Sequence, residues 1–285
     1  MTGGPVVGLV PHHARAKAVA ERAAEWLEEA GVGVRVPEAD AAATGLERFA
    51  APPEEWVAGL SFAVSLGGDG TMLRTVDLVG AEGVPILGVN MGHLGFLTEI
   101  DPPHLEGALD RVLAGDYLVS ERMLLSVTVT SDGSAGGTWL ALNEAVLEKV
   151  TSGHLVRLAA SVNGKFFTTY AADGVIVATP TGSTAYNFSA RGPIVSPGHR
   201  CLLLTPVSPH MLFDHPLVLG PDENVSFEVN GPAAVGLILD GRQIGNLSAG
   251  DVVECKEGAT PARLITFTPR DFHQLLKTKF GLADR

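Results

Sequence analysis

The sequence contains few aromatic residues and few cysteines, and it lacks any long apolar run. Aromatic side chains make up 6% of its 285 residues, so aliphatic side chains must form most of the core. The two cysteines, Cys201 and Cys255, form neither a Cys-x-x-Cys pair nor a disulfide framework. No stretch approaches the ~20 apolar residues of a membrane helix, and the first residues do not resemble a signal peptide. These absences predict a cytoplasmic globular protein.

Basic residues are also scarce. The chain has 20 Lys and Arg against 32 Asp and Glu, a formal net charge of −12 and a pI near 5.1. Nucleic-acid binders usually carry the opposite balance, so we expect no nucleic-acid partner and no membrane partner. An anionic small ligand is compatible with this charge, because a few arginines and backbone N–H groups are sufficient to bind it.

Apolar residues account for 46% of the chain, which is enough for a sizeable core and excludes disorder as the main state. The 34 glycines show no Gly-X-Y period, so they indicate tight turns and places where the backbone approaches a ligand. At ~150 residues per domain, the length predicts about two domains.

Strand and helix patterns alternate in the first part of the chain. This alternation predicts an α/β domain over 1–117, with a Rossmann-like parallel sheet covered on both faces. The expected strands are 5–10, 32–36, 60–66 and 84–89, and the expected helices are 14–30, 71–79 and 103–113.

Helical periodicity largely disappears after this region, which predicts an all-β domain over 118–269. Asn163-Gly164 and Asp240-Gly241 are typical two-residue hairpin turns. We expect the C-terminal helix, 270–285, to pack back on the first domain. The expected strands of the second domain are 117–130, 138–150, 155–162, 165–170, 174–178, 202–204, 224–229, 235–239, 251–256 and 263–268.

The first candidate site is the segment Gly-Gly-Asp-Gly-Thr at 67–71, between an apolar strand and a helix. Its glycines allow a close backbone approach, and the N–H groups that open the helix favour an anion. Asp69 would repel phosphate, unless it accepts a proton from an attacking hydroxyl or a metal intervenes. Arg74 follows one turn later and can reach a phosphate oxygen. The structural alternatives are a helix cap for Asp69 and a solvated helix residue for Arg74.

Two further segments combine polar residues with an apolar strand. Asp173-Gly174 precedes a strand that ends in small hydroxyl residues, Pro and Gly at 179–184, followed by Tyr186. This segment is expected to expose hydrogen-bond donors, with the Tyr186 ring suited to stacking on a base; the alternative is a polar loop. Asn143-Glu144 interrupts an apolar strand, so one of the two should point inward and need a partner, unless a strand end or bulge lies there.

The histidines have no zinc-site spacing, and the sequence contains neither His-Glu-x-x-His nor Gly-x-Ser-x-Gly. We therefore expect no metal held by protein ligands and no serine-hydrolase chemistry.

Together these segments resemble the NAD kinase family. The motifs at 67–71, 143–144 and 173–186 match those of the family in order, and the segment 90–97 is similar to its Gly-x-x-Gly-Phe-Leu motif. The resemblance implies a phosphotransferase that makes NADP from NAD, using ATP or polyphosphate to phosphorylate the adenosine-ribose 2′-OH. It also implies an α/β domain with a β-rich domain, Mg²⁺ bound with the donor phosphates, and a homodimer or homotetramer.

By position, the resemblance makes Asp69 the general base, with Gly70 beside the substrate. Asn143 and Glu144 would hold the adenine and ribose edges, and Asp173 the second ribose or the nicotinamide side. The remaining expected dinucleotide contacts are Arg74, His154, Ala171, Thr184, Ala185, Tyr186, Asn187, Phe188, Ser189 and Gln243.

Two other interpretations remain open at this stage. The Gly-Gly-Asp-Gly motif also occurs in lipid and sugar kinases, and a dinucleotide sensor would bind NAD(H) without turnover. The long motif at 173–186 and the absence of a basic amphipathic helix argue against a lipid kinase. The carboxylate of Asp69 argues against a sensor.

Overall fold

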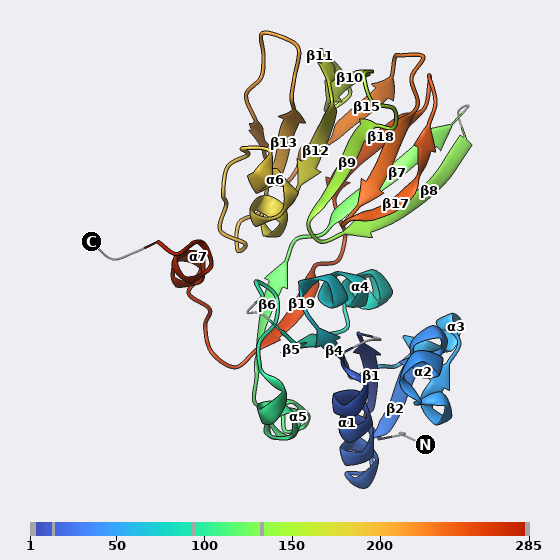
Figure 1. Cartoon of the computed structure of the whole chain (residues 1–285), viewed down its shortest axis with the longest axis vertical. Coiled ribbons are helices and arrows are strands. Elements are labelled where there is room, and N and C mark those ends of the chain that lie inside the picture. Colours follow the sequence, from blue (N-terminus) through green and yellow to red (C-terminus); the bar gives the residue numbers. More distant parts are fainter. Residues whose placement is uncertain (1–3, 13–14, 93–94, 132–133, 283–285) are drawn as a thin grey trace. The chain divides into compact units, whose positions relative to one another are not determined.

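In the computed structural model the chain forms two compact units (Figure 1). The first unit comprises 1–121 and 262–285, and the second comprises 122–261. The structure describes residues 4–12, 15–92, 95–131 and 134–282.

The first unit contains a seven-stranded sheet in the order β3-β2-β1-β4-β5-β19-β6. Strands β1 to β5 pair in parallel with their neighbours, and β19 is parallel to β5. The strands are β1 (Val6–Pro11), β2 (Gly33–Pro37), β3 (Ala50–Ala51), β4 (Phe62–Gly67), β5 (Ile86–Asn90), β6 (Leu118–Arg122) and β19 (Ala262–Thr266).

Helices connect these strands, as the alternating pattern predicts. The apolar stripes of α1 and α5 share one core cluster with alternate residues of β1, β4 and β5, so one face of the sheet is buried by helices. The helices of this unit are α1 (Lys17–Glu29), α2 (Glu38–Thr44), α3 (Pro53–Trp56), α4 (Asp69–Val79), α5 (Leu105–Leu113) and α7 (Phe272–Phe280), with 3-10 turns η1 (Glu47–Phe49), η2 (Gly80–Glu82) and η3 (Pro102–His104). Among the described residues, no helix is long and apolar enough to cross a membrane.

The second unit consists of two six-stranded antiparallel sheets, in the orders β11-β10-β15-β18-β7-β8 and β14-β13-β12-β9-β16-β17. Its strands are β7 (Leu125–Ser131), β8 (Ser134–Ala141), β9 (Glu144–Lys149), β10 (Val156–Val162), β11 (Lys165–Ala172), β12 (Gly174–Ala178), β13 (Leu202–Val207), β14 (Leu217–Leu219), β15 (Val225–Val229), β16 (Val235–Leu239), β17 (Arg242–Leu247) and β18 (Val252–Glu257). Both expected two-residue turns are confirmed, and all four of their residues have positive φ.

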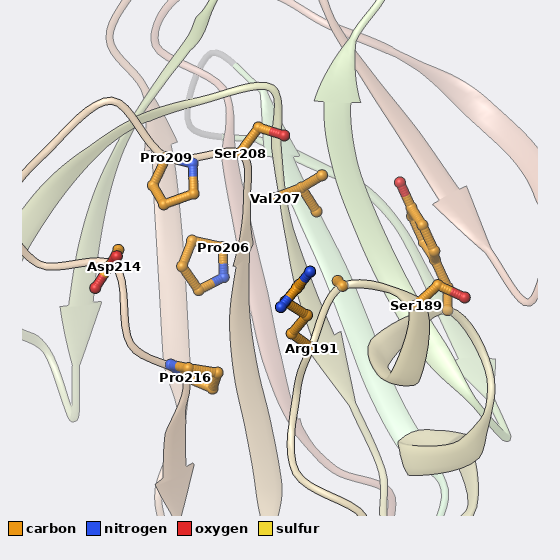
Figure 2. Close-up of a pocket in the computed structure, with 10 residues that line it drawn as sticks. Ser189, Arg191, Pro206, Val207, Ser208, Pro209, Asp214 and Pro216 are labelled. Atoms are coloured by element: carbon orange, nitrogen blue, oxygen red, sulfur yellow. The ribbon is translucent and has the colours of Figure 1, made fainter.

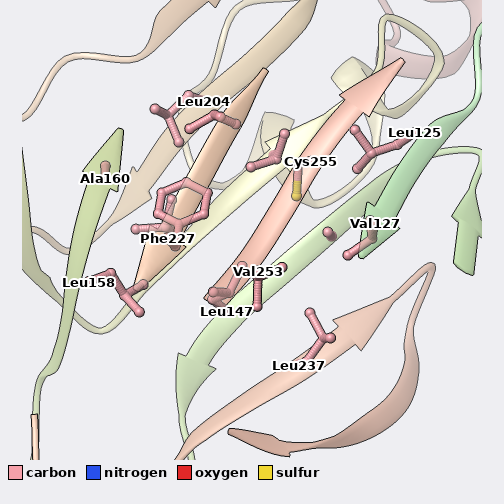
Figure 3. Close-up of a cluster of buried hydrophobic side chains, with 14 of the residues drawn as sticks. Leu125, Val127, Leu147, Leu158, Ala160, Leu204, Phe227, Leu237, Val253 and Cys255 are labelled. Carbon is pink, nitrogen blue, oxygen red and sulfur yellow. The ribbon is translucent and has the colours of Figure 1, made fainter. Parts of the chain in front are cut away.

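The core of the second unit lies between its two sheets (Figure 3). Leu158, Phe227 and Val253 come from one sheet, and Leu147 and Leu237 come from the other. These side chains are almost fully buried. Because aromatic residues are scarce, Val and Leu fill most of the space between the two pleated sheets.

Three expected strands are corrected by the structure. The segment 117–130 divides at Met123-Leu124 into β6 of the parallel sheet and β7 of the second unit. The segment 138–150 divides at 142–143 into β8 and β9, which belong to different sheets. The expected strand 263–268 is β19, which pairs with β5 rather than with the antiparallel strands. The first division lies within a continuous apolar stretch, and the second lies at the polar pair Asn143-Glu144, which a strand end explains. The alternation of two residues shows that a strand forms but not which sheet it joins.

Candidate functional site

Asp69 is the first residue of α4, directly after the extended residue Gly68. Its carboxylate accepts two backbone hydrogen bonds, from Phe96 N–H to Oδ2 at 2.9 Å and from Leu97 N–H to Oδ1 at 3.0 Å. A Cβ at Gly95 would overlap the Asp69 carboxylate, so the approach of this loop requires glycine. The carboxylate is partly exposed and fixed in direction, as a group acting on a substrate needs to be.

The segment 90–97, which carries part of the resemblance, supplies these two N–H groups. Asn90 begins it with three contacts: its Nδ2 donates to Gly92 O at 3.1 Å and to Asp101 Oδ1 at 3.2 Å, and its Oδ1 accepts from Gly92 N–H. The motif residues His93 and Leu94 lie outside the described residues. The polar side chain of Asn90 thus ties down the start of the loop that holds Asp69.

Gly70 and Arg74 follow Asp69 on the same helix. Gly70 is exposed at the helix start, with open space where a Cβ would be. The guanidinium of Arg74 makes a salt bridge to Asp40, with Nη2 2.5 Å from both carboxylate oxygens. Asp40 lies on α2 and its side chain is fully buried. The alternative of a solvated helix residue is wrong for Arg74, because it compensates a buried charge.

In the second unit, the turn at Asn143-Glu144 is held by the carboxylate of Asp240. Oδ1 accepts the N–H groups of Asn143 at 2.8 Å and Glu144 at 3.0 Å, while Oδ2 accepts that of Leu142 at 2.7 Å. The sequence indicated only a hairpin turn at Asp240. The residue type is the signal that could have revealed this role, because the short carboxylate of an Asp at a turn can accept nearby backbone N–H groups.

Glu144 is buried in this turn, with 6% of its surface exposed. Its carboxyl accepts a backbone hydrogen bond from Tyr186, which links the turn to the 179–189 segment. No hydrogen-bond partner is found for its Oε2 among the described residues. Burial, with a smaller contribution from the Asp240 carboxylate, raises the pKa of Glu144 to about 8. At neutral pH this side chain is therefore an uncharged acid that can donate as well as accept a hydrogen bond.

The hydroxyl-rich segment after β12 forms two short helices, η4 (Thr181–Thr184) and α6 (Tyr186–Ser189). We expected it to expose its hydroxyl groups, and this is wrong for three of them. Thr179 Oγ1 donates to Leu142 O at 2.6 Å, Ser183 Oγ donates to Val195 O at 3.0 Å, and Thr181 is also buried. The hydroxyl groups of Thr179 and Ser183 thus satisfy backbone carbonyls around a buried turn, whereas no hydrogen-bond partner is found for Thr181 Oγ1 among the described residues.

Asn187 anchors the same segment from inside. Its side chain is fully buried, donates to Pro193 O at 3.1 Å and accepts from Thr205 Oγ1 at 2.7 Å.

We expect Asn187→Ala to lower the free energy of unfolding by about 2–4 kcal/mol, because it leaves buried polar groups unpaired and creates a cavity. Urea unfolding measures this effect. Asn246 is exposed, so Asn246→Ala is the control. If both variants lowered the free energy of unfolding equally, the anchoring role of Asn187 would be wrong.

Tyr186 and Ser189 line a pocket of about 440 Å³ within the second unit (Figure 2). The pocket is formed with Arg191, Pro206 to Pro209, Asp214 and Pro216. Tyr186 is 39% exposed, so part of its surface is accessible to a ligand. Thr184 and Ala185 are half-buried, and Phe188 is exposed.

The other expected contacts are dispersed over the second unit. The Asp173 carboxylate, between β11 and β12, is 2.5 Å from Lys149 Nζ. The carbonyl of Ala171 accepts a hydrogen bond from His210 N–H at 2.7 Å. His154 is exposed in the loop before β10, and Gln243 is exposed on the edge strand β17.

No three His, Cys, Asp or Glu side chains are grouped in a way that could hold a metal ion, as far as the structure describes the chain.

Two family models match the chain, one in each half of the sequence. Residues 7–117 match the ATP-NAD kinase N-terminal domain, and residues 142–267 match the ATP-NAD kinase C-terminal domain. A protein of Citrifermentans bemidjiense named NAD kinase is 41% identical over 278 residues, 96% of either chain.

Two solved structures are similar to the whole chain. A yeast NADH kinase complexed with NADH has a TM-score of 0.91 at 25% identity and covers 100% of this chain and 90% of its own. An NAD kinase from Archaeoglobus fulgidus in complex with ATP has a TM-score of 0.70 at 25% identity and covers 98% of this chain and 99% of its own.

Proposed function

The chain belongs to the ATP-NAD kinase family, and we propose that it converts NAD to NADP by phosphorylating the adenosine-ribose 2′-OH, with Asp69 as the general base. ATP is the proposed donor, since a relative of similar fold is described in complex with it; polyphosphate is a second donor to test. Two hydrogen bonds fix the direction of the Asp69 carboxylate, and this observation carries the assignment.

The proposed base step follows from the lone pairs of the carboxylate. An ionised Asp has about four acceptor positions, and the two backbone N–H groups use one on each oxygen. The remaining positions can accept the proton of the ribose hydroxyl while the bond to phosphorus forms. Because the loop restrains the carboxylate, the hydroxyl can be held in line with the donor phosphate without reorganisation.

The turn at Asn143-Glu144 is the proposed adenosine contact. The turn supplies the half-buried Asn143 and the neutral acid of Glu144, and its conformation is set by Asp240. A buried oxygen without a partner indicates that a ligand hydroxyl or ring nitrogen completes the hydrogen bonding there. Asp173, His154, Ala171 and Gln243 remain proposed dinucleotide contacts, as do the residues from Thr184 to Ser189 other than Asn187. Asn187 was expected to line the dinucleotide, but it is fully buried and its amide bonds Pro193 O and Thr205 Oγ1.

We expect a divalent cation to bind with the donor phosphates. The described side chains offer no cluster of three ligands, and Mg²⁺ is commonly coordinated by phosphate oxygens together with water. Mg²⁺ would neutralise charge on the transferred phosphoryl group. Arg74 remains a proposed phosphate contact and would have to act while bound to Asp40.

The activity is tested directly by incubating the protein with NAD, Mg²⁺ and ATP or polyphosphate, and by reading NADP with an NADP-specific dehydrogenase. NADP formation with either donor supports the proposal. Tight NAD binding without product would indicate a sensor. In a parallel incubation with a lipid extract and labelled ATP, a labelled lipid product would indicate a lipid kinase.

Tyr186 gives an independent test of the dinucleotide site. A stacked ring contributes roughly 1 kcal/mol beyond its buried area, so Tyr186→Ala should weaken NAD binding about fivefold or more. Tyr186→Phe should keep most of the affinity. Calorimetric titration with NAD measures both variants. Equal damage by Phe and Ala would show that the hydroxyl group, not the ring face, contacts the ligand.

We also propose that the protein is a cytoplasmic homodimer or homotetramer. Both cysteines are buried free thiols, which fits a reducing compartment. Light scattering at several protein concentrations measures the state.

A further inference from the structure

A single arginine near the C-terminus holds the loop that positions Asp69. Arg270 Nη1 donates to Phe96 O at 2.9 Å, and Nη2 donates to Thr98 O at 2.5 Å. The same guanidinium contacts Glu99 Oε2 through Nε at 3.0 Å and through Nη2 at 2.7 Å. All these residues belong to the first unit.

Glu99 extends the arrangement on its other side. Its second oxygen, Oε1, accepts the backbone N–H of Phe267 at 2.8 Å, so one carboxylate connects the loop to the segment that carries Arg270. The side chains of Arg270 and Glu99 are only 20% and 10% exposed. A charge pair shielded to this degree, with additional hydrogen bonds on both partners, imposes a defined geometry.

The loop residue bonded to Arg270 is also bonded to Asp69. Phe96 donates its N–H to Asp69 Oδ2 and offers its carbonyl to Arg270. Leu97 lies between the two carbonyl groups that Arg270 contacts, and its N–H reaches Asp69 Oδ1. The guanidinium therefore fixes the orientation of the peptide groups that direct the carboxylate.

We propose that Arg270, with Glu99, is a positioning residue for the phosphoryl transfer, acting through the backbone of 96–98 on Asp69. This inference rests on the proposed role of Asp69 as the base. Arg270 contacts the opposite side of the loop peptides from Asp69, and its contribution to the reaction is geometric. Small displacements of a reacting group can lower a rate by up to ~10²-fold.

The test compares Arg270→Ala and Arg270→Lys with Arg22→Ala. Arg22 is a matched control in the same unit, because it also donates to a backbone carbonyl, that of Pro102, and pairs with a glutamate, Glu106. Arg270→Ala should lower kcat by on the order of 10- to 100-fold with little change in KM for NAD. Free guanidinium at low millimolar concentration should restore part of the activity, and Arg270→Lys should retain more activity than Ala. Arg22→Ala should have normal kcat.

A double-variant cycle separates this inference from the proposed base. If Arg270 acts through Asp69, Arg270→Ala should reduce kcat much less in the Asp69→Asn background than in the wild-type protein. If Arg270→Ala does not fold, Glu99→Gln replaces it, since this variant keeps the shape of the side chain and one acceptor oxygen but removes the charge and the second acceptor. A normal kcat in these variants, an equal loss in Arg22→Ala, or fully additive losses would overturn the positioning role. A normal kcat in Asp69→Asn would overturn the base instead.

Discussion

Asp69→Asn should lower kcat by about 10²- to 10⁴-fold, the usual range for losing general base catalysis. An asparagine amide has the shape of the carboxylate but cannot take the ribose proton. The structure adds a second effect, because both carboxylate oxygens accept backbone N–H groups. An amide offers only one acceptor, so either Phe96 or Leu97 loses its partner, which costs about 1–3 kcal/mol of stability.

The measurements for this variant are kcat in the coupled assay, NAD affinity by calorimetry and urea unfolding on one preparation. NAD affinity should change little, since the amide can still hydrogen-bond the ribose hydroxyl. Asp110→Asn, an exposed residue of α5, controls for removing one negative charge from the same unit. A near-normal kcat would show that Asp69 only begins helix α4 and is not the base. Loss of NAD binding would show that Asp69 positions the substrate and does not take its proton.

Much of the fold could be predicted because its signals are local. The helical stripe of α1, the strand β4 and the two-residue turns at 163–164 and 240–241 each depend on neighbouring residues, and the structure confirms them. The short elements between β2 and β4, namely α2, η1, β3 and α3, were not predicted. Their helices and strand are too short for periodicity to distinguish them from a loop.

The destination of β19 could not be read from the sequence. The segment has the composition of a buried strand, which suits either an antiparallel or a parallel sheet. Its pairing with β5 joins Leu264 to Ile86, which are far apart in the chain. Local patterns determine that a strand forms, but its neighbour depends on packing of the whole unit.

The same limit applies to the candidate site. Asp69, Asn143 and Glu144 could be singled out because a polar residue interrupted an apolar or glycine-rich context. The residues that hold them could not. Asp240 was recognised only as a turn residue and Arg270 was not singled out, because each acts on backbone groups about 100 to 170 positions away. The inward hydrogen bonds of Thr179 and Ser183 were missed because their acceptors, Leu142 O and Val195 O, lie in other segments, 37 and 12 positions away.

Glu144 is expected to make the protein less stable as pH rises from about 4.5 to about 8. Its pKa is 4.5 for an ordinary exposed carboxyl and about 8 in the folded chain, chiefly through burial and then through Asp240. Between these values the unfolded chain has released the proton and the folded chain has kept it. The unfolded state thus binds fewer protons, so the free energy of unfolding falls with pH in this window and levels off above it. At about 1.4 kcal/mol per pKa unit, the loss is several kcal/mol.

Glu144→Gln should remove this loss, because glutamine resembles the neutral acid and never ionises. The variant should match the wild-type protein near pH 5 and be more stable by several kcal/mol at pH 9. Urea unfolding at pH 5, 7 and 9 measures the free energy of unfolding of both proteins. All other titrating groups are the same in the two proteins, so their contributions cancel in the difference. Glu148→Gln is the matched control, since Glu148 lies on the same strand but is half-exposed. Its stability should follow the wild-type pH dependence.

Ligand binding should report the same titration. If the neutral acid donates a hydrogen bond to the adenosine, the KM for NAD of the wild-type protein should rise above about pH 8, where Glu144 ionises. Glu144→Gln should bind NAD well at pH 7 and show no such rise, while Glu144→Ala should lose on the order of tenfold in affinity or more, at about 1–3 kcal/mol per unpaired buried group. The Asp240 carboxylate stays beside the site in all three proteins, so its charge does not account for a difference between them. A Glu144→Gln variant that binds poorly at pH 7 and is no more stable than the wild-type protein at pH 9 would show that the ionised carboxylate is the functional form.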